Sequence, residues 1–223
     1  MHGKKILYLF DIDGTLLHAH RAGRDAFDAV FEARHGIAGA SEGVRYGGKT
    51  DPAIVEEIFV ARLGRRPDAD ERAAFLDAYL PLLRTRLAVT GVDVLPGVRE
   101  TLAYLREREV PLGIATGNIR RGADEKLAAA ELGAWFELGG YGCDSAIRAE
   151  LVARAIERAR ERHDVMEVVV VGDTTHDIAA ARACKATVCA VATGSDARDL
   201  LAGADAVFDA MTELPAWHAA RFA

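Results

Sequence analysis

Short apolar runs recur along the chain, one near its start and the others in its second half. Ile6 to Phe10 are uninterruptedly hydrophobic and follow two lysines, a pattern typical of a parallel strand covered on both faces. Comparable runs predict further strands over 111–116, 168–171, 187–191 and 206–208.

Amphipathic segments fill the intervals between these strands. From the first strand to Leu95 the pattern is helical for roughly seventy residues. Thr50-Asp51-Pro52 begins one of these helices, because Thr50 can cap it and Pro52 suits its first turn. Helices are predicted over 21–35, from Asp51 onward and over 70–87, and then over 98–108, 121–131 and 146–162.

The alternation of strands and helices predicts an α/β fold, a Rossmann-like parallel sheet with helices on both faces. The helical block after the first strand interrupts this alternation, so we interpret it as an inserted all-helical domain. We assign residues 1–16 and 95–223 to the core and residues 17–94 to the insertion. Because ligands bind beyond the carboxyl ends of parallel strands, the insertion would overhang the site.

Composition and charge narrow the class of protein. The 223 residues are 50% hydrophobic and 28% charged with a net charge of −6, as in an ordinary globular protein without a basic stripe for nucleic acid. No apolar run reaches transmembrane length, and Met1 leads directly into the first strand, so we expect neither a membrane partner nor a signal peptide. Cys143, Cys184 and Cys189 lack a CxxC spacing, and we interpret them as small core residues in a reducing cytoplasm.

The first strand ends in the segment that says most about chemistry, Asp11-Ile12-Asp13-Gly14-Thr15. In extended chain the side chains of Asp11 and Asp13 point the same way, and Gly14 permits a sharp turn. Two neighbouring carboxylates repel each other unless a positive charge lies between them, so we predict a divalent cation. The alternative is a plain strand end with turn-forming residues.

The strand over 111–116 is followed by a second group of polar residues. Thr116-Gly117-Asn118 offers a hydroxyl, exposed backbone amides and the N-terminus of a helix, all of which favour a phosphate group. The alternative is a strand-to-helix turn with Asn118 as the cap.

The strand over 168–171 ends in Gly172-Asp173, with Asp177 four residues further on. We predict that Asp173 is the second metal carboxylate and that Asp177 orients this ligand or a bound water. The alternative is a turn in which Asp177 caps the following helix.

A basic residue should balance the negative charge of a phosphate and these carboxylates. Our candidate is Arg148, near the start of a predicted helix, where the helix dipole disfavours a cation unless an anion holds it. A solvent-facing arginine is the alternative. Lys126 is the rival, but its charged neighbours in the helix predict a solvated face.

These residues, taken in order, resemble the four motifs of the haloacid dehalogenase superfamily, in its phosphoglycolate phosphatase-like branch. The four matching segments are Asp11-Ile12-Asp13-Gly14-Thr15, Thr116, a basic residue, and Gly172-Asp173 with Asp177. The inserted helices resemble the mobile cap of that family, and Gly48-Lys49-Thr50-Asp51 resembles a segment often seen in these caps. The basic residue of the third motif is most often lysine, whereas here it is Arg148.

The resemblance implies a Mg²⁺-dependent phosphatase acting on a small phosphorylated metabolite. Asp11 would attack phosphorus to form an aspartyl-phosphate, and Asp13 would act as general acid and then as general base. Asp11, the backbone carbonyl of Asp13 and Asp173 would bind the Mg²⁺ ion. Thr116 and Arg148 would hold the phosphoryl oxygens.

Two other functions are compatible with the same core. A phosphomutase would differ in how its cap excludes water from the aspartyl-phosphate, and a non-catalytic binding protein would lack an essential carboxylate, whereas this chain has them all. Lys49, in a loop before a helix, could reach a second anionic group of the substrate, and its alternative is a solvated loop lysine. The cap side chains decide selectivity, so the sequence specifies neither the substrate nor the oligomeric state.

Overall fold

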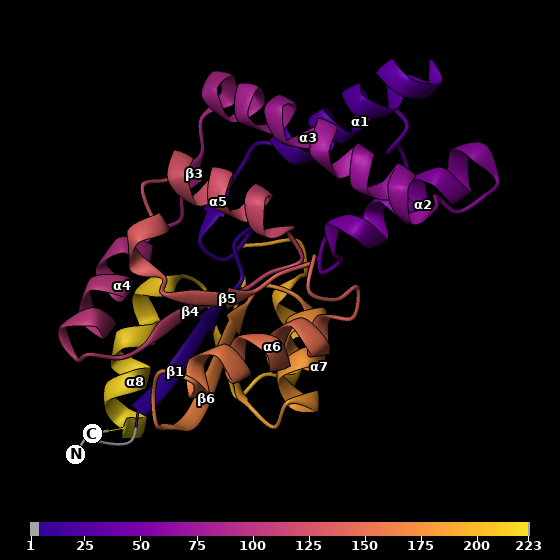
Figure 1. Ribbon diagram of the computed structural model, residues 1–223. Helices are drawn as coiled ribbons and strands as arrows, with labels where there is room; N and C mark the ends of the chain where they lie inside the picture. The colour runs from indigo at the N-terminus through magenta and orange to yellow at the C-terminus, as the bar shows by residue number, and fades with distance from the viewer. Residues whose placement is uncertain (1–4, 223) are drawn as a thin grey trace.

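A parallel sheet of six strands forms the centre of the computed structural model, which describes residues 5–222 (Figure 1). The strands lie in the order β5-β4-β1-β6-β7-β8, and every neighbouring pair is parallel. They are β1 (Lys5–Phe10), β4 (Leu112–Ala115), β5 (Leu138–Gly140), β6 (Val165–Gly172), β7 (Thr187–Val191) and β8 (Ala206–Phe208). The predicted α/β class is therefore confirmed.

Helices cover both faces of this sheet, which explains why the apolar run of β1 is continuous. Tyr8 and Phe10 belong to a buried cluster that includes residues of α4 and α8, whereas Leu7 and Leu9 belong to a second cluster with α6 and α7 (Figure 1). The helices that follow the inserted segment are α4 (Val98–Glu107), α5 (Arg120–Ala129), α6 (Arg148–Arg160), α7 (Thr175–Ala183) and α8 (Leu214–Phe222).

The segment between β1 and α4 carries three helices that lie together beyond one end of the sheet (Figure 1). They are α1 (Ala22–His35), α2 (Asp51–Leu63) and α3 (Ala69–Thr90). Strands β2 (Leu17–His18) and β3 (Asp93–Val94) pair antiparallel where the chain leaves and re-enters the core. The domain boundaries expected after residue 16 and before residue 95 fall beside this short ladder.

Some elements differ from the sequence-based expectation. Strand β5 and helix α8 were not predicted, and Cys143 is exposed rather than part of the core, although Cys189 is buried. Among the described residues, no helix has both the length and the apolar character needed to cross a membrane.

Candidate active site

Three carboxylates meet at the carboxyl ends of β1 and β6. One oxygen from each of Asp11, Asp173 and Asp177 lies within 4.8 Å of the oxygens of the other two, and all three residues are buried. The hydroxyl of Thr15 donates to Asp173 Oδ1 at 3.2 Å, and the backbone N–H of Ser195 donates to Asp173 Oδ2 at 3.0 Å. Asp173 and Asp177 follow Asp11 by 162 and 166 positions in the sequence, yet the three carboxylates form one anionic site.

Burial and crowding disfavour the ionised form of two of these carboxyls. Burial, followed by the charges of Asp177 and Asp11, raises the pKa of Asp173 to about 8. Burial raises the pKa of Asp11 to about 6, although the charge of Arg148 opposes the shift. A cation among these groups would relieve the repulsion, and a set of carboxylate oxygens suits a hard divalent ion such as Mg²⁺. The residues therefore fit the metal that the sequence predicts.

Arg148, the first residue of α6, lies against the same carboxylates. Its Nε donates to Asp177 Oδ1 at 2.9 Å, and its Nη2 lies 2.8 Å from Asp11 Oδ2 and 2.6 Å from Asp177 Oδ1. Nη2 is buried, and despite these ion-pair distances it is not aligned for a hydrogen bond with either carboxylate. The guanidinium thus has donor capacity left for an additional anion at Asp11.

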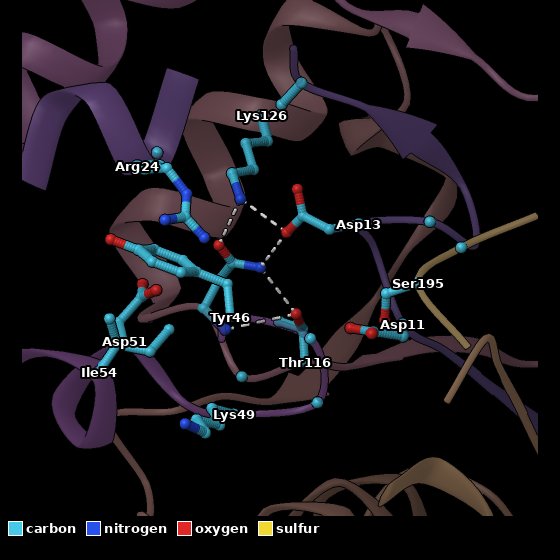
Figure 2. Close-up of a pocket in the computed structure, with 18 of the residues that line it drawn as sticks. Asp11, Asp13, Arg24, Tyr46, Lys49, Asp51, Ile54, Thr116, Lys126 and Ser195 are labelled. Carbon is cyan, nitrogen blue, oxygen red and sulfur yellow. Dashed lines mark hydrogen bonds and ion pairs between the residues drawn. The ribbon is translucent and has the colours of Figure 1, made fainter. Parts of the chain in front are cut away.

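Asp13 lies beside the cluster and has different partners (Figure 2). Its Oδ2 accepts from Lys126 Nζ at 2.6 Å and from Asn118 Nδ2 at 2.8 Å, while Lys126 Nζ also donates to Asn118 Oδ1 at 2.7 Å. Partial desolvation in the pocket opposes ionisation of Asp13, but the charge and hydrogen bond of Lys126 and the hydrogen bond from Asn118 outweigh it and lower the pKa. The Asp13 side chain is 43% exposed, so solvent in the pocket can reach this carboxylate.

The expectation that Lys126 lies on a solvated face was wrong. The residue is only 5% exposed, because α5 turns this side chain into the site. Lys126 lies four residues after Gly122 and three after Ala123, which are also buried, so it belongs to the narrow inward face of the helix. The small residues at these spacings are the signal that could have placed it.

Thr116-Gly117-Asn118 follows β4 as expected and faces both the carboxylates and the inserted helices. Thr116 is buried, and its hydroxyl accepts from Asn118 Nδ2 at 2.9 Å. The Gly117 carbonyl accepts from the backbone N–H of Asp51 at 2.8 Å, and a Cβ at Gly117 would overlap the Lys49 carbonyl oxygen. The glycine therefore allows a loop of the insertion to lie directly on the core.

A pocket of about 560 Å³ connects the carboxylates with the inserted helices (Figure 2). Lys49 lines it, as predicted for a substrate contact, but its ammonium is ion-paired with Glu57. Asp51, from the predicted cap segment, also lines the pocket. Arg24 and Tyr46 line it too, and they were not predicted, because their approach depends on how the helices after β1 fold back over the sheet.

Comparisons with known proteins agree with this geometry. A family model described as haloacid dehalogenase-like hydrolase matches residues 7–185. The phosphoglycolate phosphatase (plasmid) of Cupriavidus necator is 31% identical over 220 residues, which cover 93% of this chain and 90% of that protein.

Solved structures with the same fold include CbbY from Rhodobacter sphaeroides in complex with phosphate, with a TM-score of 0.76 at 19% identity over 95% of this chain and 96% of CbbY. A Bacteroides vulgatus protein assigned as a β-phosphoglucomutase has a TM-score of 0.71 at 17% identity over 97% of this chain and 89% of its own. At these identities the similarity shows the fold alone.

Proposed function

This chain belongs to the haloacid dehalogenase-like hydrolase family, and from that premise we propose that it is a phosphatase of small phosphomonoesters that works through an aspartyl-phosphate on Asp11. Family membership confirms the resemblance and the hydrolase class expected from the sequence. The observation that carries the proposal is the position of Asp11, buried between Arg148 and Asp173 at the floor of a pocket large enough for a metabolite. The phosphatase among its relatives supports the same reaction.

In the first step a carboxylate oxygen of Asp11 bonds to phosphorus, and the bond from phosphorus to the alcohol oxygen breaks. The departing oxygen keeps the electron pair and takes a proton from Asp13, which must be protonated for this step. In the second step water attacks phosphorus, the bond to Asp11 breaks, and the Asp13 carboxylate takes the water's proton. Lys126 and Asn118 favour the carboxylate form of Asp13, which is the form needed for the second step.

The remaining groups orient and neutralise the phosphoryl oxygens. Thr116 and Arg148 would donate to them, together with the backbone amides of Gly117 and Asn118. Asp11, Asp173 and the backbone carbonyl of Asp13 would hold Mg²⁺, with Asp177 orienting the site through Arg148. A bound Mg²⁺ ion supplies positive charge that stabilises the transferring phosphoryl group.

We assign residues 17–94 as a cap over a core of residues 1–16 and 95–223. The pocket is lined by side chains of both parts, so a closed cap would limit the access of bulk water to Asp11. Opening at the β2–β3 ladder would then release the product. Lys49, in the cap loop, stays the sequence-based candidate for contact with the leaving group.

The test is hydrolysis of p-nitrophenyl phosphate by the purified chain with Mg²⁺, in water enriched in ¹⁸O. We expect phosphate release that carries one ¹⁸O atom per phosphate and that excess chelator abolishes. Asp11→Asn should remove turnover almost completely, since an amide is not a nucleophile here, and Asp13→Asn should cost about 10²–10⁴-fold in rate. Asp70→Asn, on the exposed side of α3, is the control.

Three outcomes would contradict parts of this proposal. Full activity in excess chelator would exclude the metal, and normal turnover by Asp11→Asn would exclude the nucleophile. Conversion of a sugar phosphate into its isomer without phosphate release would instead indicate a phosphomutase, which shares the core chemistry but returns the phosphoryl group to the substrate.

A further inference from the structure

One cation on the cap side of the pocket has no carboxylate oxygen within 4.0 Å among the described residues. Five arginine and lysine side chains line the pocket, namely Arg21, Arg24, Lys49, Lys126 and Arg148. Lys49 is paired with Glu57, Lys126 with Asp13, and Arg148 with Asp11 and Asp177. Arg21, which is largely exposed, lies 3.7 Å from Asp25.

Arg24 differs from the other four. Within the part of the chain that the structure describes, no carboxylate oxygen lies within 4.0 Å of its guanidinium, although the residue is half-buried. Two acidic residues follow it on its own helix: Asp25 lies beside Arg21, and Asp28 accepts a hydrogen bond from the Ser41 backbone N–H at 2.7 Å. Desolvating a cation is unfavourable, so an unbalanced one beside a pocket indicates that an anion binds there.

The guanidinium of Arg24 is held in a fixed orientation. Nη1 donates to the Ser41 carbonyl at 3.0 Å, and Nη2 donates to the Val44 carbonyl at 2.9 Å. Its Cζ lies 4.3 Å from the centre of the Tyr46 ring. These contacts use two of the five N–H groups of a guanidinium, and fixing the fork in advance lowers the entropy cost of binding a planar or tetrahedral anion.

The wall around Arg24 has two buried hydroxyls, those of Tyr46 and Ser41. Apart from each other, they have no hydrogen-bond partner among the described residues. Figure 2 shows Arg24 and Tyr46 together on one side of the pocket, with Asp11 on the opposite side. Phe27 and Ile54 line the same cap side, so the charged group lies on a partly apolar wall.

We propose that Arg24, stacked on Tyr46, binds an anionic group on the alcohol part of the substrate. The preferred substrates are then phosphomonoesters of acidic alcohols, which carry a carboxylate or a second phosphate, rather than esters of neutral alcohols. The inference rests on the proposed function, because Asp11 fixes the end of the pocket where the transferred phosphoryl group binds. The volume of about 560 Å³ accommodates an alcohol part of several carbon atoms between the two ends.

The competing explanation is that Arg24 only anchors the loop over residues 41–46 to α1. Replacement of a purely structural arginine would change KM for all substrates alike. Replacement of a substrate-binding arginine would raise KM only for substrates with an anionic leaving group. The experiment therefore compares pairs of substrates in which the leaving group is anionic in one member and neutral in the other. The carboxylate pair is 4-carboxyphenyl phosphate and 4-carbamoylphenyl phosphate, and the phosphate pair is 1,3-propanediol bisphosphate and 3-hydroxypropyl phosphate.

For Arg24→Met we expect KM for the anionic member of at least one pair to rise about 10- to 100-fold, the range for a hydrogen-bonded charge. KM for the neutral member should change less than about threefold, and kcat should change little for either, because the contact is made in ground and transition states alike. The pair that responds identifies carboxylate or phosphate as the second anion. Arg24→Lys should recover part of the discrimination because it keeps the charge without the fork.

Arg34→Met is the matched control, since Arg34 is on the same helix and also donates to a backbone carbonyl, that of Ala74 at 2.9 Å. A second measurement does not depend on turnover: calorimetric binding of the four compounds to Asp11→Asn and to Asp11→Asn with Arg24→Met. Loss of affinity confined to the anionic member of at least one pair supports the proposal. Equal losses for both members of each pair, or no loss in either pair, overturn it, even if the wild-type chain hydrolyses all four and the phosphatase assignment stands.

Discussion

At the residue scale, two cations divide the carboxylates of the site between them. Arg148 lies against Asp11 and Asp177, and Lys126 lies against Asp13. The carboxylates themselves could be predicted, because parallel strands deliver their carboxyl ends to one edge of the sheet. The partner of Asp13 was missed, because the charged neighbours of Lys126 suggest a solvated face. The small buried residues that mark the inward face of α5, a helix that packs against α3, indicate its true position.

The two cations should have separable effects. Arg148→Ala should weaken inhibition by inorganic phosphate and reduce turnover strongly, and Arg148→Lys should retain part of both. Lys126→Met should reduce kcat about tenfold to a hundredfold, less than loss of the Asp13 carboxyl itself, with little change in phosphate inhibition. The measurement is kcat and the inhibition constant of phosphate for each variant.

Arg154→Ala is the control for this series, because Arg154 is on the same helix as Arg148 but pairs with Glu157 at the surface. If Lys126→Met weakened phosphate inhibition as much as Arg148→Ala, Lys126 would be the phosphate ligand and Arg148 would serve only to neutralise Asp11 and Asp177.

At the scale of elements, the most informative contact is between the cap loop and helix α5. Thr50-Asp51-Pro52 begins α2 as predicted, and the Thr50 hydroxyl accepts from the Ala53 N–H at 3.4 Å. The Asp51 carboxylate has a different partner, the backbone N–H of Ile119 at 2.8 Å, just before α5. The sequence places Asp51 at a helix start but contains nothing that says it also caps a second helix 68 residues away.

The missed elements have similar causes. Strand β5 is Leu138-Gly139-Gly140, and two glycines in three residues carry no strand propensity. It is a strand because the edge of β4 pairs with it, and because Gly140 lets the Leu151 carbonyl approach where a Cβ would overlap. Strands β2 and β3 have two residues each, too few for any periodicity, and exist because the two crossings of the chain are neighbours.

Asp51→Ala should loosen the contact between cap and core. The substitution leaves the buried Ile119 N–H without its acceptor, which costs about 1–3 kcal/mol in the free energy of unfolding. Amide hydrogen exchange at Ile119 should become faster, and Asp51→Asn should show a smaller effect because its side-chain oxygen can still accept. Unchanged exchange at Ile119 in Asp51→Ala would mean that this hydrogen bond does not hold the cap loop in solution.

At the scale of the whole molecule, the cap and the core share one continuous buried cluster. Phe27 and Phe75 of the cap helices belong to the same cluster as Phe10 of the central strand. The sequence could predict the α/β class, because it depends on periodicity alone. How far the cap bends over the sheet, and hence which cap side chains reach the pocket, depends on packing between residues far apart in the chain.

The face of the sheet that α4 and α8 cover carries a buried polar pair, which should make the stability of the whole protein depend on pH. Tyr8 of β1 and His218 of α8 are hydrogen-bonded, with 2.8 Å between the hydroxyl oxygen and Nδ1, and His218 is 6% exposed. Burial, and next the charge of Arg108, lower the pKa of His218. The rings of Tyr104 and Phe222 also pack against this imidazole.

Because folding makes protonation of His218 harder, the unfolded chain takes up this proton first as the pH falls. The contribution of His218 to the free energy of unfolding is therefore complete above an ordinary histidine pKa of about 6.5 and is lost as the pH falls toward the lower pKa of His218 in the folded protein.

Buried carboxyls with raised pKa values, such as Asp173, act in the opposite direction, so the test is a difference between variants. His218→Gln, which keeps a neutral partner for Tyr8, should lose less stability than the wild type between pH 7 and pH 5 in urea denaturation. Equal pH dependence in the wild type and His218→Gln would show that His218 is protonated equally easily in the folded and unfolded chain, and that α8 docks on β1 through its apolar contacts alone.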